Sequence, residues 1–237
     1  MDAKPNNGRR GFLAKLGLSA GVASVAAGLP RTADAQASAR TLVSDRAAIR
    51  EIVDGWIIWR DGGQWDELLR AWHPGGTMAS TRFEGTAEGF LEDTKRGYAA
   101  GSKARHSQSG FWCEIAGDRA FSVTGMSIMQ RGALAGVEVD VTCLGFFVDF
   151  FSFRNGRWAI DRRQPAYDRD WAYPVDPAKP AYFDPVKLAG FPAPYKHLAY
   201  IQNATGQSIT MNLPEARGPT FAALMAQAHA WLRPGAA

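Results

Sequence analysis

Asp61 is a lone acid at the end of an apolar helix face, in the stretch IIWRDGGQWDELLRAWHPGGTMAS. Gly62 and Gly63 follow it directly, and glycines at this point end a helix. A carboxylate placed there has two possible settings. It lies either on a solvated helix end, where it has no chemical role, or beside a cavity, where it could take part in proton transfer. The local pattern leaves both settings open.

The four histidines are the side chains that could act as bases near neutral pH, because imidazole titrates there. His106 begins a strand-like segment. His73 stands before Pro74 at a helix end, which predicts a structural role. His197 and His229 lie on helical patterns near the C-terminus, and we expect packing or surface roles for both.

Other patterns with chemical potential are weaker. Asp168 and Asp170 stand two apart in YDRDW, but no further oxygen ligand is spaced to complete a metal site, so a solvated strand end is predicted. Cys113 and Cys143 lie in apolar segments without a CxxC or histidine spacing, and we expect buried free thiols in preference to a disulfide. No serine has a G-x-S-x-G setting. The sequence therefore predicts no metal, no cofactor and no serine nucleophile.

These residues need a scaffold, and hydrophobic periodicity predicts its elements. Apolar residues recur at intervals of three and four over 44–60, which predicts an amphipathic helix that ends just before Asp61. Further helices are expected over QWDELLRAW and 86–99, and strands over 77–83, 106–116, 119–131, 137–153 and 157–167. This order predicts an α+β fold, in which three N-terminal helices pack in a strongly curved, mostly antiparallel sheet.

The first 35 residues have the features of an export signal. Arg9 and Arg10 precede an uncharged run over 16–29 and the small-residue site Ala33-Asp34-Ala35, the order found in a twin-arginine signal peptide. We expect cleavage near Ala35 and a periplasmic or secreted mature protein without a stable membrane anchor.

The charge of the mature chain follows from that cleavage. Residues 1–35 contain five basic and two acidic side chains, a net charge of +3, so +1 of the whole-chain +4 remains. No run of Lys or Arg occurs in the remainder. This balance argues against nucleic-acid binding.

The segment 171–237 is predicted to be an extension of the domain. It begins with a proline-rich stretch and continues with helical patterns over 195–203 and 219–232. It contains too many apolar residues for a disordered tail. We expect residues 195–232 to pack on the domain and to close or border the mouth of its cavity.

Several segments together resemble the SnoaL-like branch of the nuclear transport factor 2-like superfamily. They are the helix that ends at Asp61, GQWDELLRAWHPGGT, the RFEG before the third helix, the strand that opens with His106, and the NGRWAIDRR hairpin. The resemblance covers about Ser44 to Tyr167, and it places a cone domain at 44–170. It implies that the curved sheet and the helices form a cone, whose cavity is the binding or active site. Some members are polyketide cyclases, dehydratases, dehydrochlorinases or isomerases, and others have no catalytic role.

The resemblance also implies a catalytic pair. In the scytalone dehydratase and hexachlorocyclohexane dehydrochlorinase members, an acid just after the first helix meets a histidine from the first long strand. By position these residues are Asp61 and His106. His106 would take a proton from carbon, while Asp61 would fix the tautomer of the imidazole and stabilise the imidazolium.

An arginine is implied in the same cavity. Arg163 stands five residues after Trp158, as in the dehydrochlorinase-like pattern, and would bind a halide, hydroxyl or carboxylate leaving group. The alternative is a solvated arginine on the outer face of the sheet. Because side chains alternate along a strand, Arg162 and Arg163 cannot both point inward without a bulge.

The pocket departs from the family pattern at one position. The dehydrochlorinase members have a lysine one turn before the acid, where this sequence has Trp56. That departure argues against dehydrochlorination and predicts a more apolar and aromatic pocket. The aromatic side chains expected to line it are Trp56, Trp59, Tyr98, Trp112 and Phe147.

Two functions remain open. The first is a cofactor-independent lyase or isomerase that acts on a small apolar or cyclic molecule. The second is a non-catalytic periplasmic ligand-binding or accessory protein. A retained cavity with Asp61 and His106 within hydrogen-bond reach favours the first, and a filled cone favours the second. The resemblance implies a homodimer, paired through the outer face of the sheet.

Overall fold

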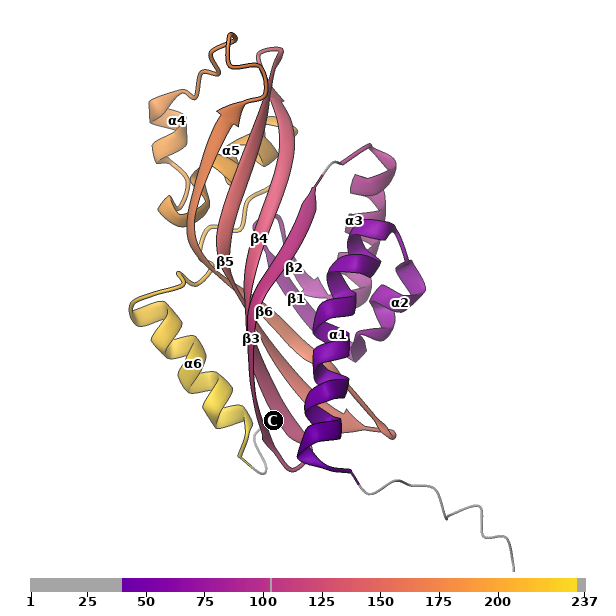
Figure 1. Ribbon diagram of the computed structural model, residues 1–237. Helices are drawn as coiled ribbons and strands as arrows, with labels where there is room; N and C mark the ends of the chain where they lie inside the picture. Colours follow the sequence, from indigo (N-terminus) through magenta and orange to yellow (C-terminus); the bar gives the residue numbers. More distant parts are fainter. Residues whose placement is uncertain (1–39, 103, 234–237) are drawn as a thin grey trace, which may run out of the picture. The chain divides into compact units, whose positions relative to one another are not determined.

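The computed structural model describes residues 40–102 and 104–233, so the predicted signal peptide lies outside the described residues. The described part contains three N-terminal helices, a six-stranded sheet and further helices towards the C-terminus (Figure 1). This is the α+β class that the order of segments predicted. No helix in the described part is both long and apolar enough to cross a membrane.

The helix α1, Leu42–Gly62, carries Asp61 in its last turn. Thr41 caps its N-terminus and forms a capping box with Ser44. Gly63 ends the helix in the left-handed conformation, at a φ of 70°, which a glycine adopts without steric cost. The helix therefore continues two residues beyond the predicted end, and Asp61 is part of it.

One face of α1 is buried in the core through Ile49, Val53 and Trp56, as the periodicity predicted. At its N-terminal end, Asp45 accepts a hydrogen bond from Trp158 Nε1 at 2.8 Å. Because Trp158 belongs to the last strand of the chain, this bond connects the first helix to a strand in the interior of the sheet. Two more helices follow, α2 at Trp65–Arg70 and α3 at Ala87–Ala99.

The sheet is mixed, with the strand order β2-β1-β6-β5-β4-β3. Its strands are β1 Trp72–Ser80, β2 Phe83–Thr86, β3 Arg105–Ala116, β4 Arg119–Leu134, β5 Val137–Arg154 and β6 Arg157–Pro174. Strands β3 to β6 form the predicted antiparallel meander, which turns at Asn155 and Gly156, both with positive φ. Strand β1 pairs in parallel with β6, a long-range contact that the local patterns did not indicate.

The inner face of the sheet is covered by helices from both ends of the chain. The helix α5, Lys196–Ala204, buries Leu198 and Ile201 in the same core as the apolar face of α1. Strand β4 contributes alternate residues to this core, among them Ala120, Met126, Ile128 and Leu134. Two short elements precede α5, the helix α4 at Pro185–Ala189 and a 3₁₀ turn at Ala193–Tyr195.

The outer face of the sheet is covered in part by the helix α6, Pro219–Trp231 (Figure 1). Leu224 and Ala228 pack there against Phe121, Val148 and Phe150 of β4 and β5. The predicted packing of the C-terminal segment is therefore confirmed, but α6 lies away from the cavity mouth. It also occupies part of the surface through which a dimer was predicted to form.

The two cysteines are buried free thiols, as predicted. Burial raises the pKa of the Cys113 thiol to about 11 and holds the pKa of Cys143 well above its ordinary value. Both side chains are therefore protonated and act as small apolar groups in the core.

Candidate active site

Asp61 and His106 are in direct contact, although they come from different elements. Asp61 lies in the last turn of α1, and His106 is the second residue of β3. His106 Nδ1 lies 2.9 Å from Asp61 Oδ1, and the backbone N–H of His106 donates to Asp61 Oδ2 at 2.6 Å. Both side chains are 8% exposed. The predicted pairing of the two residues is therefore confirmed.

The contacts fix the protonation of the imidazole. A carboxylate can only accept hydrogen bonds, so Nδ1 of His106 carries the proton that points to Asp61. The other ring nitrogen, Nε2, is left with a lone pair and has no hydrogen-bond partner among the described residues. This is the tautomer that a general base requires.

The pKa values of the pair support the same state. Burial lowers the pKa of His106 below its ordinary value, and the charges of Arg60 and Arg163 lower it further, against the opposing effect of Asp61. Burial raises the pKa of Asp61, but the hydrogen bonds from His106 and the charge of Arg60 outweigh it and leave that pKa below its usual value. At neutral pH the pair is a neutral imidazole beside a carboxylate.

His106 lines a small inner cavity of about 60 Å³. Trp56 and Phe147 form part of its wall, as predicted, and their ring centroids lie 5.4 Å apart. The Trp56 ring also meets the imidazole edge-on at 5.5 Å. Other wall residues are Met78, Phe90, Ile128, Tyr167, Gln202 and Gln207. The C-terminal segment therefore borders this cavity through α5 and the residues after it, and the space has room for one small chemical group.

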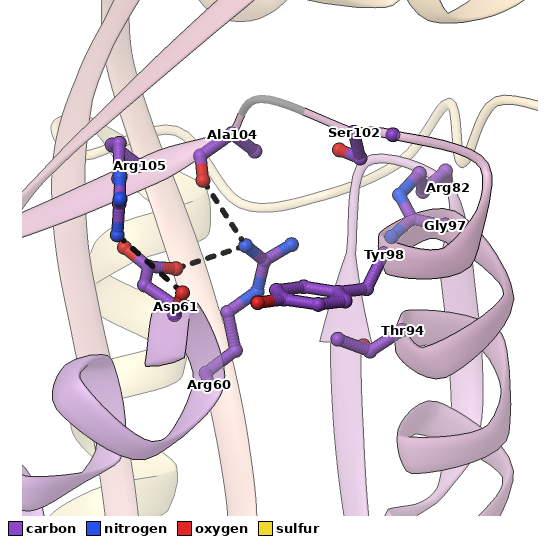
Figure 2. Close-up of a pocket in the computed structure, with 10 residues that line it drawn as sticks. Arg60, Asp61, Arg82, Thr94, Gly97, Tyr98, Ser102, Ala104 and Arg105 are labelled. Atoms are coloured by element: carbon purple, nitrogen blue, oxygen red, sulfur yellow. Dashed lines mark hydrogen bonds and ion pairs between the residues drawn. The ribbon is translucent and has the colours of Figure 1, made fainter. Parts of the chain in front are cut away.

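A larger vestibule of about 360 Å³ lies beside Asp61. Its wall contains Arg60, Arg82, Thr94, Tyr98 and Arg105, and Figure 2 shows the Arg60 guanidinium between Asp61 and the Tyr98 ring. Arg60 and Arg82 line both the vestibule and the inner cavity, so the two spaces adjoin.

Three of the predicted aromatic wall residues do not line the inner cavity. Tyr98 is half exposed and packs edge-on against Trp65 at the vestibule. Trp59 lies along its own helix over Gly55 and does not line the inner cavity. Trp112 is 47% exposed and contacts Phe121 on the outer face of the sheet.

The position of Trp112 has a backbone cause. Counting from His106, regular alternation would turn residue 112 inward. The register of β3 against β4 shifts between Ser109 and Phe111, because Gly110 forms a bulge with a φ of 56°. Beyond the bulge Cys113 is buried and Trp112 turns outward. An isolated glycine in a strand pattern was the signal for this bulge.

Arg163 points inward and is fully buried, so the alternative of a solvated arginine is wrong. Its guanidinium donates from Nε and Nη2 to Asp149 at 2.6 and 2.7 Å. It also lies 4.4 Å from the centroid of the Trp56 ring and 4.5 Å from that of Phe147, on the core side of the cavity wall. Arg162 lies on the other face, over Phe150.

Two residues of this site were missed in the sequence. Asp149 is a fully buried acid within the apolar run FFVDFF, and such a charge requires a buried partner. Arg60 stands next to Asp61, and its Nη1 donates to Asp61 Oδ1 at 2.9 Å. A lone acid in an apolar strand was a usable signal, whereas nothing in the local pattern distinguished Arg60.

A second aspartate–histidine pair lies outside this site. Asp170 accepts from His197 Nδ1 at 2.8 Å and from the backbone N–H groups of His197 and Leu198 at 2.7 and 2.8 Å. Its side chain is fully buried, so the predicted solvated strand end is wrong. No group of three or more His, Cys, Asp and Glu side chains in the described part of the chain could hold a metal ion.

Residues 41–164 match the family model of the SnoaL-like domain, and the chain belongs to this family. It is 32% identical over 178 residues to pea pathogenicity protein 2 of Fusarium vanettenii, covering 73% of this chain and 76% of that protein. A PEP2-like protein of the same fungus is 30% identical over 178 residues, with the same coverage.

Solved structures to which the chain is similar include a hexachlorocyclohexane dehydrochlorinase (LinA) of type 2, at 15% identity and a TM-score of 0.49 over 60% of this chain and 95% of that one. Another is a protein of unknown function with a cystatin-like fold from Nostoc punctiforme, at 17% identity and a TM-score of 0.42 over 54% and 93%. Membership of the family rests on the sequence matches.

Proposed function

We propose that the protein is a cofactor-independent lyase or isomerase of small molecules, in which His106 is the general base. The observation that carries this proposal is the buried Asp61–His106 pair, whose free nitrogen Nε2 belongs to a residue that lines a cavity. A neutral imidazole with a carboxylate on its far nitrogen is suited to taking a proton from carbon.

The proposed reaction needs no other reactant. Nε2 takes a proton from a substrate carbon, and the electron pair of that C–H bond moves into a new double bond. In an elimination, a leaving group on the neighbouring carbon departs with its own electron pair, and the imidazolium can return the proton to a departing hydroxide as water. In an isomerisation, the electrons pass to a carbonyl oxygen, and the proton returns to a different carbon.

Arg163 has a supporting place in this proposal. Its guanidinium lies behind Trp56 and Phe147 and is held by Asp149. It therefore acts on the cavity through its charge, which helps to keep His106 neutral before the reaction. Direct contact with a leaving group, as predicted from the sequence, would require those rings to move.

The size of the inner cavity limits the substrate. With about 60 Å³ beside His106, only the reacting part of a molecule fits there, and the rest must lie in the vestibule. The same small volume favours a second candidate function, a non-catalytic ligand-binding protein that uses the vestibule alone.

Hydrogen exchange in heavy water tests the two functions. Small cyclic alcohols, halides and enolisable ketones are incubated with the protein, and proton NMR follows deuterium entering the substrate carbon. A base at His106 predicts exchange or product formation that His106→Ala abolishes. If at least one compound bound but none in the set underwent exchange or turnover, the result would support the ligand-binding protein instead.

We also propose export through the twin-arginine route, which the arginine pair and the small-residue site support. The expected mature N-terminus is near Gln36, and Arg9→Lys with Arg10→Lys should retain the protein in the cytoplasm. Mass spectrometry of the periplasmic fraction checks both points, and an intact Met1 in exported protein would contradict cleavage.

A further inference from the structure

The vestibule beside Asp61 has an excess of positive charge. Arg60, Arg82 and Arg105 line it. Arg82 forms an ion pair with Asp93, and Arg105 donates to the backbone carbonyl of Asp61 at 3.4 Å. Asp93 also pairs with Arg96, so among the described residues the carboxylates of Asp61 and Asp93 are outnumbered by the guanidinium groups around them, while His106 is neutral. The described part of this group therefore has a net positive charge.

Arg60 forms an ion pair with Asp61, but it is the buried guanidinium of the three, and its hydrogen-bond donors are only partly satisfied. The residue is 9% exposed, and its Nη1 donates to Asp61 Oδ1 at 2.9 Å and to the carbonyl of Ala104 at 3.4 Å, as the dashed lines in Figure 2 show. Its Nε is buried without a hydrogen-bond partner, and Nη2 has none among the described residues. Leaving donors of a buried cation unpaired is costly.

A second buried polar atom at the vestibule is also unpaired. Thr94 Oγ1, on α3, has no partner in the described part of the chain and belongs to the vestibule wall. The pKa of Arg60 also indicates that its positive charge is unfavourable here. Burial lowers this pKa, and the charges of Arg82 and Arg105 lower it further, against the effect of Asp61. A bound anion would relieve this repulsion and accept from the free donors.

We propose that the vestibule binds a carboxylate group of the substrate, with Arg60 as its main ligand and Arg82 and Thr94 as further contacts. A carboxylate can accept from Nε and Nη2 of one guanidinium at the same time, which suits the free donors of Arg60. Arg60 lines both spaces and shares Asp61 Oδ1 with the imidazole, so a carboxylate held there is close to the reacting centre. This inference rests on the proposed function and narrows its substrate to a small carboxylic acid.

Binding of three related probes tests the proposal without turnover. Benzoate, benzamide and phenyl phosphate are titrated into the full chain by calorimetry or ligand-observed NMR. We expect benzoate to bind about tenfold or more tightly than benzamide, the size of a charge-assisted hydrogen bond. Arg60→Gln should remove this preference, and Arg82→Gln should reduce it. Arg50→Gln is the matched control, because it removes the same charge from the exposed surface of α1.

Each other outcome of the titration has a defined meaning. Equal binding of benzoate and benzamide, or a preference that survives in Arg60→Gln, would overturn the proposal. Tighter binding of phenyl phosphate than of benzoate would overturn the choice of a carboxylate. If Arg60→Gln fails to fold, Arg82→Gln and Thr94→Val decide the question. His106→Ala should still bind benzoate, so loss of turnover and loss of anion binding are separate results.

Discussion

The Asp61–His106 and Asp170–His197 pairs have nearly the same hydrogen-bond geometry in two different parts of the fold. In each pair, one carboxylate oxygen meets Nδ1 of the histidine and the other accepts from its backbone N–H. The Nδ1 distances are 2.9 and 2.8 Å. Both pairs join an element of the meander to a helix.

The two pairs differ in their surroundings. Asp170 also accepts from the backbone N–H of Leu198, so it caps the N-terminal end of α5, and Phe183 packs edge-on against the His197 ring at 5.3 Å. Asp61 instead shares its oxygen with the Arg60 guanidinium, and His106 lines a cavity. The motif by itself therefore does not define a reactive site. The cavity beside His106 and the nearby guanidinium of Arg60 make the difference.

The largest difference should come from the same substitution at the two acids. In Asp61→Asn the amide would donate to Nδ1 and move the imidazole proton to Nε2, which removes the base. We expect a loss of about 10² to 10⁴ in turnover, a similar loss for His106→Ala, and little more for the double variant. Asp170→Asn should leave turnover nearly unchanged. The measurement is kcat/KM on any substrate that the exchange screen finds.

Two results would remove the distinction between the pairs. One is turnover that survives both Asp61→Asn and His106→Ala. The other is a double variant whose loss of turnover equals the product of the two single losses. Residues that act as one unit should instead lose little more in the double variant than in either single variant.

A stability loss should mark the second pair. Asp170→Ala leaves the backbone N–H groups of His197 and Leu198 without their acceptor at a buried helix end. We expect the free energy of unfolding to fall by about 2 kcal/mol, with kcat of the folded fraction retained. Urea unfolding measures this change. An unchanged midpoint would show that α5 needs no cap from β6.

The pH dependence of stability should have opposite signs at the two acids. Burial raises the pKa of Asp170 despite its three donors, so the native state keeps this proton longer than the unfolded chain does. Its contribution to stability is therefore lost as pH rises from 3.8 through the raised pKa. The pKa of Asp61 is lowered, so its contribution is lost as pH falls below 3.8.

Urea unfolding of the two Asn variants across pH isolates these contributions. Relative to the unmodified protein, Asp170→Asn should gain stability as pH rises through the window above 3.8, and Asp61→Asn should lose it as pH rises from more acidic values. If the stability differences of both variants changed with pH in the same direction, the two carboxylates would have equivalent environments.

The smallest effect is expected from His197→Ala. It removes one hydrogen bond to Asp170, while the two backbone donors at the helix end remain. We expect a loss of about 1 kcal/mol or less in unfolding free energy and no change in kcat/KM. A large loss of turnover in this variant would give the second pair a role that its surroundings do not indicate.

The helices and strands could be predicted from the sequence because each depends on a local pattern of apolar residues. The periodicity over α1 and the alternation along the meander both follow from which face of each element is buried. Asp61 and His106 could be placed together because the order of elements resembles a known fold. The inward direction of Arg163 was also predicted correctly.

Two predictions failed because the partner lies far away in the sequence, and one failed because a single residue interrupts a regular strand. Trp112 was misplaced by one bulged residue, Gly110, which reverses the faces of the rest of β3. Asp170 was taken for a solvated residue because the helix that it caps comes 26 residues later, at Lys196, and nothing nearby indicates that contact. The parallel pairing of β1 with β6 depends on the folded sheet as a whole.

The N-terminal helix and strand make contacts with residues far along the chain, and these contacts bear on the order in which the elements fold. Asp45 of α1 meets Trp158 across 113 residues of sequence, and β1 has no parallel partner until β6 exists. Closing loops of this length costs entropy before the contacts form, so such steps are slow. We therefore expect the β3–β6 meander to form early from neighbouring hairpins, and α1 and β1 to dock late. The Asp61–His106 pair, which needs α1 in place, would then assemble in one of the last steps of folding.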